Sequence, residues 1–177
     1  VIYFLFRRRT FFLTLAPVAM LLLARPTPAS FFEGLPLLVG GQAMRLWSAG
    51  YLHKLADLTT AGPFALCRNP LYLGSFLLCL GYVVMGARLD MAVVCIALFW
   101  LFHGGAIVYE ERLLADKFGE PYTRYCKSVA RLLPRPHSLS GTGSFSLAQM
   151  VSNREHLGLL ATIALAALFG LRAYGVF

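Results

Sequence analysis

The apolar residues of the chain fall into long blocks that short polar segments separate. Each block approaches the roughly 20 residues that an α-helix needs to cross the hydrocarbon core of a bilayer. None shows the alternation of apolar and polar positions that is typical of a half-buried β-strand. The pattern therefore predicts an all-α protein, a polytopic membrane helical bundle. We expect about five transmembrane helices, at about residues 10–24, 34–52, 70–86, 91–109 and 157–176.

The first apolar block admits a second interpretation. Arg7, Arg8 and Arg9 precede it, and the small residues of "RPTPAS" follow it, which is also the pattern of a cleaved signal peptide. We favour a membrane helix because the rest of the chain is itself polytopic. The mass of the mature chain would distinguish the two interpretations.

Composition and charge agree with a membrane protein. Hydrophobic residues make up 58% of the chain and charged residues only 14%, whereas apolar usage in soluble domains is nearer half. Most of the basic residues fall in residues 1–9, 53–69 and 110–156, which the positive-inside rule places in the cytoplasm. Topology and anionic lipid thus account for the net charge of +8, and we expect no nucleic-acid partner. The expected location is the cell (inner) membrane, with the N-terminus cytoplasmic.

We interpret residues 1–177 as a single integral membrane domain. Residues 138–156 are predicted to form a linker before the last span, because "SLSGTGSFSLAQ" is rich in Ser and Gly. The four cysteines form no Cys-x-x-Cys or Cys/His spacing, so we expect packing roles for them and no metal.

The stretch "GPFALCRNPLYLGSFLLCLG" opens the third predicted span. Asn69 can cap this helix, and Pro70 suits its first position, where no donor is needed. A helix start does not explain Arg68, whose positive charge opposes the helix dipole, nor Tyr72 and Gly74 one turn inside. Free N–H groups at the helix N-terminus, Arg68 and a close-approach glycine would together hold a ligand carboxylate.

Carboxylates and a histidine mark the far end of the fourth span. Glu110 and Glu111 follow "FWLFHGGAIVY" directly, where anions oppose the helix dipole unless the helix continues into the cytoplasm. His103 precedes Glu110 by two turns and shares its face. A histidine at membrane depth is a functional candidate, although a lone one is more often hydrogen-bonded within the bundle.

Arg45 lies inside the second predicted span, and Gly40 and Gly41 before it allow close helix packing. Its guanidinium either snorkels to the surface or needs an anionic partner. That partner is either a glutamate or a substrate carboxylate.

The segment "FGEPYTRYCKSVARLLP" alternates basic with aromatic or aliphatic positions. The pattern predicts an amphipathic cytoplasmic helix at the membrane interface. Its tyrosines could also offer ring faces to an aromatic base or a cation.

In combination, these motifs resemble the isoprenylcysteine carboxyl methyltransferase and phospholipid methyltransferase group of integral membrane enzymes. The resemblance covers about residues 40–134. The residues that carry it, in chain order, are Gly62-Pro63-Phe64, Arg68-Asn69-Pro70-Leu71-Tyr72-Leu73-Gly74, Glu110-Glu111, Phe118-Gly119, Tyr122-x-x-Tyr125 and Val129 through Pro134.

The resemblance implies S-adenosylmethionine as methyl donor, S-adenosylhomocysteine as product and a lipid or lipid-like acceptor. It also implies catalytic roles for Arg45, beside the methyl-accepting group, and for Glu110. The implied cofactor-binding residues are Arg68, Asn69, Pro70, Tyr72, Leu73, Gly74, Glu110, Glu111, Tyr122 and Tyr125. Asn69 stands where the family has a histidine, and an amide cannot carry a proton, which argues against a base at this position.

The chemistry of methyl transfer suits these residues, because its main demand is alignment of the reactants. A prenylcysteine-like carboxylate acceptor needs no base, since opposite charges neutralise in the transition state. A phospholipid amine would have to lose a proton, which Glu110 or His103 could accept. Two other functions stay open: an NADPH-dependent sterol-reductase-like membrane enzyme, and a non-enzymatic membrane binding module.

Overall fold

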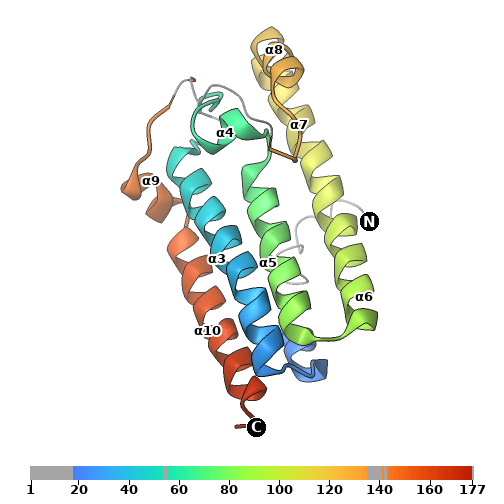
Figure 1. Cartoon of the computed structure of the whole chain (residues 1–177). Coiled ribbons are helices and arrows are strands. Elements are labelled where there is room, and N and C mark those ends of the chain that lie inside the picture. Colours follow the sequence, from blue (N-terminus) through green and yellow to red (C-terminus); the bar gives the residue numbers. More distant parts are fainter. Residues whose placement is uncertain (1–17, 54–55, 135–140, 142, 177) are drawn as a thin grey trace.

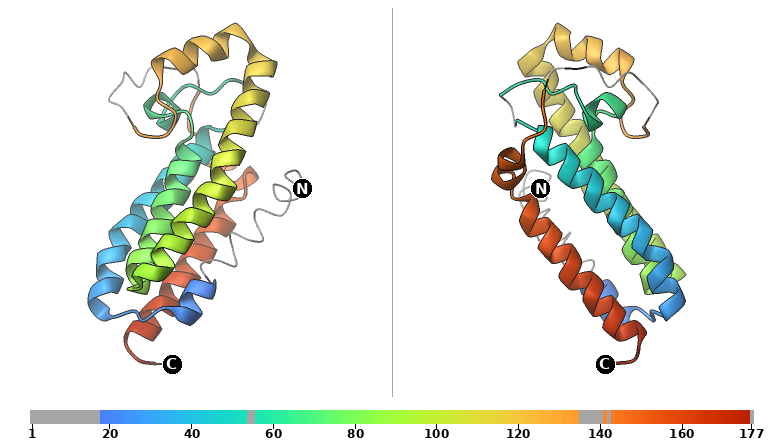
Figure 2. Two further views of the ribbon diagram at one scale, coloured as in Figure 1. Left: turned by 90° about the vertical axis from the view of Figure 1, so that its right-hand side faces the viewer. Right: turned by 60° about the vertical axis from the view of Figure 1, so that its left-hand side comes forward.

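A computed structural model describes residues 18–53, 56–134, 141 and 143–176, and these residues form helices and turns without a β-strand. The long helices lie side by side in an elongated bundle (Figure 1), and Figure 2 shows the same bundle from two other sides. The prediction of an all-α protein is confirmed. The long helices are α3 (Pro28–Tyr51), α5 (Pro70–Gly86), α6 (Leu89–Phe99), α7 (Gly105–Phe118) and α10 (Glu155–Ala173); the short ones are α4 (Pro63–Leu66), α8 (Glu120–Ser128) and α9 (Leu147–Ser152).

The helices agree with most of the predicted spans. Two helices in the described chain are long and apolar enough to cross a membrane: the continuous Leu89–Phe118, which joins α6 to α7, and α10. Helix α5 has the predicted bounds and is apolar, but it is shorter, and α3 begins before the predicted start of its span. Residues 18–23 are helical, and the earlier part of the first predicted span lies outside the described residues. The number of five transmembrane helices stays a prediction.

Glycines bring α3 and α5 into backbone contact. A Cβ atom added to Gly41 would lie 2.7 Å from the carbonyl oxygen of Gly74, and one added to Gly74 would lie 2.7 Å from that of Gly41. Side chains larger than hydrogen would therefore force the helices apart, as at other small-residue helix contacts. Of the two adjacent glycines expected to pack closely, only Gly41 does so; a Cβ on Gly40 would meet no described atom within 4 Å.

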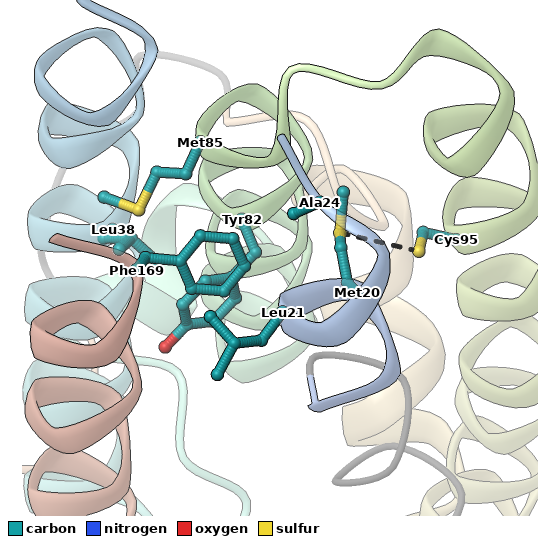
Figure 3. Close-up of a cluster of buried hydrophobic side chains, with 8 residues drawn as sticks. All are labelled: Met20, Leu21, Ala24, Leu38, Tyr82, Met85, Cys95 and Phe169. Atoms are coloured by element: carbon teal, nitrogen blue, oxygen red, sulfur yellow. Dashed lines mark hydrogen bonds between the residues drawn. The ribbon is translucent and has the colours of Figure 1, made fainter. Parts of the chain in front are cut away.

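A buried apolar cluster joins the helices at the opposite end from α4 and α8 (Figure 3). Phe169 of α10 is fully buried and packs on the ring of Tyr82 of α5, with 5.6 Å between the ring centroids. The cluster ties α10 to α3, α5, α6 and the helical segment before α3. Its buried members are Met20, Leu21, Ala24, Leu38, Tyr82, Met85, Cys95 and Phe169.

Helix α8 turns its aromatic residues toward the protein. Gly119, at φ 57°, adopts the backbone conformation that favours glycine, and the chain turns here between α7 and α8. Tyr122, Tyr125 and Val129 then form a second buried cluster. These residues pack against protein rather than lipid, and the placement of α8 at a membrane interface stays a prediction.

The segment predicted to be a linker contains regular structure. Helix α9 lies within it, and Ser146 caps this helix by accepting a hydrogen bond from the Gln149 N–H at 3.2 Å. Gln149 and Asn153 in turn donate to the carbonyl of Leu52 at the end of α3, at 2.8 and 2.9 Å. The segment is thus attached to the bundle, and α10 already begins at Glu155.

We expect Gly41→Val to destabilise the protein by about 1–3 kcal/mol, the usual cost of overpacking. The neighbouring Gly40→Val is the matched control, since it adds the same side chain where no described atom is close. Thermal unfolding in detergent, followed by circular dichroism, measures both. Equal melting temperatures for the two variants would contradict the close α3–α5 contact.

Candidate functional site

Many of the site residues predicted from the sequence lie at one end of the bundle. Helices α4, α8 and α9 and the end of α7 all lie there (Figure 1). The described parts of the two segments that the charge pattern assigned to one side of a membrane, residues 53–69 and 110–156, thus lie at the same end of the bundle. Which side of a membrane this end faces stays a prediction.

Arg68 joins three elements at this end. Its Nε donates to Oε1 of Glu111 on α7 at 3.2 Å, and its Nη1 donates to the carbonyls of Cys126 at 2.8 Å and Val129 at 3.1 Å. The backbone N–H of Arg68 donates to the carbonyl of Ala130 at 2.8 Å. The cation that the α5 dipole disfavours is therefore paired with a carboxylate, and it also satisfies carbonyls at the end of α8.

Asn69 occupies the N-cap position of α5, but its side chain makes no capping hydrogen bond in the described chain. This corrects the sequence interpretation. The side-chain amide donates instead to Oε1 of Glu111 and to the carbonyl of Arg131, both at 3.0 Å. Arg131 in turn pairs with Oε2 of Glu111 at 2.8 Å. An amide serves well here, because the position needs a donor to a carboxylate and no proton transfer.

The Glu111 carboxylate therefore binds three side chains at once: Arg68, Asn69 and Arg131. We call these four residues the Glu111 clamp. The carboxylate is only 11% exposed, which suits a charge-assisted network rather than a solvated glutamate. Its two oxygens are engaged, so a ligand could reach Glu111 only by displacing one of these partners. Sequence reasoning could not rank Glu111 against Glu110, because the two are adjacent and chemically identical.

A small cavity of about 50 Å³ lies beside the clamp. Its aromatic walls are Phe64 of α4 and Tyr122 and Tyr125 of α8. Arg68 reaches it, and Leu52, His53 and residues 57–59 help to close it. The Tyr125 hydroxyl donates to the Phe64 carbonyl at 2.6 Å, which ties α8 to α4. Burial raises the pKa of Tyr125, so this hydroxyl stays a donor.

The Tyr122 hydroxyl is buried and makes no hydrogen bond within the described chain. Burial, followed by the nearby charge of Glu111, raises the pKa of Tyr122 and keeps it protonated. A buried hydroxyl without a partner is costly in a folded protein. It marks a position where a polar ligand atom would be stabilised.

Tyr72 lies in a different contact, against His103. The two rings meet edge to face with 5.5 Å between centroids, and His103 also stacks on Phe99 at 4.0 Å. His103 belongs to a π-helical segment, η1 (Trp100–Gly104), between α6 and α7. Such segments occur frequently at functional sites, and the sequence contains no signal for this one.

Other predicted site residues serve the packing of α5. Gly74 faces the α3 backbone, so its close approach is to Gly41 and Arg45 rather than to a ligand. Leu73 and Pro70 are buried. Glu110 is half-buried on α7 and does not line the cavity. The structure thus brings Arg68, Asn69, Glu111, Tyr122 and Tyr125 together, whereas Tyr72, Gly74 and Arg45 make their contacts elsewhere in the bundle.

Arg45 has the anionic partner that its position demanded. Its guanidinium forms a two-pronged ion pair with Glu155 at the start of α10, and it donates a third hydrogen bond to Ser75 of α5. Of the two partners considered from the sequence, the glutamate is the one observed. Glu155 itself was not singled out by the sequence, because a linker was expected there.

The cysteines and acidic residues form no further reactive centre in the described chain. Burial raises the pKa of the Cys67 thiol to about 11, so it remains a protonated packing residue. No group of three or more His, Cys, Asp and Glu side chains in the described chain is placed to hold a metal ion.

Comparisons with known proteins give the family of this region. Residues 37–121 match the family model described as phospholipid methyltransferase. The chain is similar to the cobalt-zinc-cadmium resistance protein CzcN of Cupriavidus metallidurans, with 33% identity over 58% of this chain and 48% of that protein. It is also similar to protein-S-isoprenylcysteine O-methyltransferase A of Arabidopsis thaliana, with 36% identity over 44% of this chain and 39% of that protein.

A third relative is the protein-S-isoprenylcysteine O-methyltransferase of Mus musculus, with 33% identity over 57% of this chain and 40% of that protein. The chain thus spans under half the length of these curated relatives. No solved structure matches it. The matched residues include α5, α7 and three residues of the Glu111 clamp: Arg68, Asn69 and Glu111. The resemblance found in the sequence is therefore confirmed: residues 37–121 match the phospholipid methyltransferase family model, and the relatives above include isoprenylcysteine O-methyltransferases.

Proposed function

We propose that the chain is a membrane methyltransferase that uses S-adenosylmethionine on a lipid-like acceptor at the cytoplasmic face. The observation that carries this proposal is the position of the Glu111 clamp beside an aromatic cavity, in a region of the phospholipid methyltransferase family. Two of the relatives described above are named as isoprenylcysteine O-methyltransferases, which supports the reaction class. The long apolar helices support a site at a membrane surface.

The lining of the cavity suits a nucleoside. Phe64, Tyr122 and Tyr125 offer ring faces to adenine, and the buried Tyr122 hydroxyl offers a hydrogen bond. Arg68 also lines the cavity, where it would approach the methionine end of the donor while it stays paired with Glu111. When bound, S-adenosylmethionine supplies an electrophilic methyl group on a positive sulfur. These residues would hold the donor by stacking, hydrogen bonding and charge pairing.

The cavity must widen to take such a donor. Its volume of about 50 Å³ is well below the ≈ 300–1,000 Å³ typical of small-molecule sites. Leu52, His53 and residues 57–59 lie between α3 and α4, outside any helix, and close one side of the cavity. We propose that these residues move away from α8 when the donor enters. Water would then be excluded when it closes again, which favours reaction of charged groups.

Other residues of the chain serve orientation and proton transfer. The Glu111 clamp fixes the ends of α5 and α8, so that Arg68 and the tyrosines keep their positions relative to one another. Glu110, on the same turn of α7, remains the carboxylate for donor hydroxyls or for a proton from an amine acceptor. Tyr72 and His103 would border the path from the bilayer, and Arg45 would face the accepting group.

We expect S-adenosylhomocysteine to bind the purified protein saturably at micromolar concentrations, whereas NADPH does not. Calorimetric titration of the full chain in detergent or nanodiscs with each nucleotide measures this. Binding of NADPH alone would identify a reductase, and binding of neither would favour a non-enzymatic binding module. Incubation of lipid extract with labelled donor, followed by identification of the labelled lipid, would then reveal the acceptor.

The two adjacent glutamates should respond differently to loss of charge. We expect Glu111→Gln to destabilise the protein by about 1.5–3 kcal/mol, the range for hydrogen bonds to charged groups, because Arg68 and Arg131 lose their shared partner. Glu110→Gln should cost less stability but weaken S-adenosylhomocysteine binding. Thermal unfolding and calorimetric titration of both variants test this pair. Equal loss of stability in the two would contradict the clamp.

Asn69 should be replaceable by another donor but not by an apolar group of similar size. We expect Asn69→His to keep affinity for S-adenosylhomocysteine close to that of the unchanged protein, because an imidazole N–H can still donate to Glu111. Asn69→Leu should lower the affinity by about tenfold or more, the effect of losing about 1.4 kcal/mol. Titration of both variants measures the difference. Unchanged affinity in Asn69→Leu would show that the amide does not position the site.

A further inference from the structure

The ion pair between Arg45 and Glu155 connects the family region to a helix outside it. Arg45 lies on α3 inside residues 37–121, whereas Glu155 begins α10, beyond that region. The Arg45 Nε donates to Oε2 of Glu155 at 3.2 Å, and Nη2 donates to Oε1 at 2.6 Å. Ser75 of α5 accepts a hydrogen bond from Nη1. Three helices thus meet at one guanidinium.

Glu155 begins α10 beside Arg45. It stands in the first turn of α10, where the helix dipole favours an anion. Only 11% of its side chain is exposed, against 24% of that of Arg45, so the carboxylate depends on this partner. Separation of a buried ion pair is strongly unfavourable, because it leaves an uncompensated charge.

Helix α10 cannot easily withdraw Glu155 from this position. Thr162, two turns further along, donates to Oε1 of Gln42 on α3 at 3.0 Å. Phe169 is fully buried in the cluster with Tyr82 and Leu38 at the other end (Figure 3). These contacts fix α10 along its length against α3 and α5. These contacts thus hold Glu155 next to Arg45.

This geometry bears on which acceptor the site can take, and the inference rests on the proposed function. A guanidinium binds a carboxylate best through two parallel N–H donors. In this structure Glu155 already occupies the Nε and Nη2 donors of Arg45, and Ser75 occupies Nη1. An incoming carboxylate would have to displace Glu155 and would then be repelled by its charge.

We propose that Glu155 is a specificity-determining residue that neutralises Arg45 and excludes carboxylate acceptors. Proteins often achieve specificity by placing a repulsive group against the unwanted ligand. The acceptor class that fits is a lipid whose methylated group carries no negative charge, such as the amine of a phospholipid headgroup. Glu155 is absent from the family region, so this preference belongs to the part of the chain that α10 adds.

The test compares two ligands that differ in one charge: N-acetyl-S-farnesylcysteine and its methyl ester. Binding of each to the full chain in nanodiscs of neutral lipid is measured without any methyl donor. We expect the unchanged protein to bind the acid more weakly than the ester. In Glu155→Gln the ratio of the two dissociation constants, acid over ester, should fall by about tenfold, equivalent to about 1.4 kcal/mol.

Control variants separate charge from packing. Glu33→Gln removes an exposed glutamate on the same α3 helix that carries Arg45, and it should leave the ratio unchanged. Replacement of both partners, Arg45→Gln with Glu155→Gln, should reverse the gain in acid binding. Melting temperatures identify any variant that fails to fold. If Glu155→Gln fails to fold, the proposal is tested by whether the unchanged protein binds the acid more weakly than the ester.

Tighter binding of the acid than of the ester by the unchanged protein would overturn the proposal, as would an unchanged ratio in a folded Glu155→Gln. Binding of neither ligand by any variant would overturn it as well. Failure of the proposed function shows separately, as absence of S-adenosylhomocysteine binding to the unchanged protein. The two failures are thus distinguishable.

Discussion

The arrangement of this protein depends on one partly buried carboxylate, that of Glu111. It lies where three stretches distant in sequence meet: the start of α5, the middle of α7 and the residues after α8. The start of α5 supplies donors from Arg68 and Asn69, the residues after α8 supply one from Arg131, and α7 supplies the carboxylate itself. A charge taken out of water must be paired and hydrogen-bonded, and here one anion meets two cations and an amide. The aromatic cavity lies beside this point because the clamp holds Arg68 against the carbonyls at the end of α8.

Below the Glu111 clamp, the helical bundle keeps α3 and α5 in backbone contact. At Gly41 and Gly74 the two helices approach so closely that no Cβ would fit between them. Arg45, one turn after Gly41, is thereby pressed against α5, where it reaches Ser75 and Glu155. The molecule thus has two polar centres at different depths. One surrounds Glu111 at the end of the bundle, and the other surrounds Arg45 between the helices.

The sequence predicted the features that follow from local pattern. The bounds of α5 follow from Pro70 and an apolar run, and the need of Arg45 for an anionic partner follows from its depth in a span. Residues at the N-terminus of α5 and on α8 were expected in one site, and Arg68, Tyr122 and Tyr125 do line one cavity. Their shared location was predictable because helix periodicity and motif order constrain which segments lie at the same end, and their role in binding a donor stays a prediction.

Features that depend on tertiary contacts could not be predicted. The sequence pattern predicts that Asn69 caps a helix, yet its side-chain amide donates to Glu111. A hydrogen bond to a charged carboxylate is stronger than the neutral hydrogen bond of a helix cap. Gly74 was expected to allow the close approach of a ligand, yet α3 occupies the space beside it. The π-helical segment that places His103 against Tyr72 has no sequence signature. Glu155 was hidden in a stretch whose Ser and Gly content indicated a linker.

The most direct test of the central claim is to locate the nucleoside on the protein. An azido-adenosine analogue of S-adenosylhomocysteine, activated by light and followed by peptide mass spectrometry, labels the residues around the adenine. We predict labelling within residues 58–64 of the α4 segment and 118–129 of the α8 segment, suppressed by excess unlabelled S-adenosylhomocysteine. Competed labelling confined to the opposite end of the bundle, around residues 86–90, would contradict a donor site beside the Glu111 clamp.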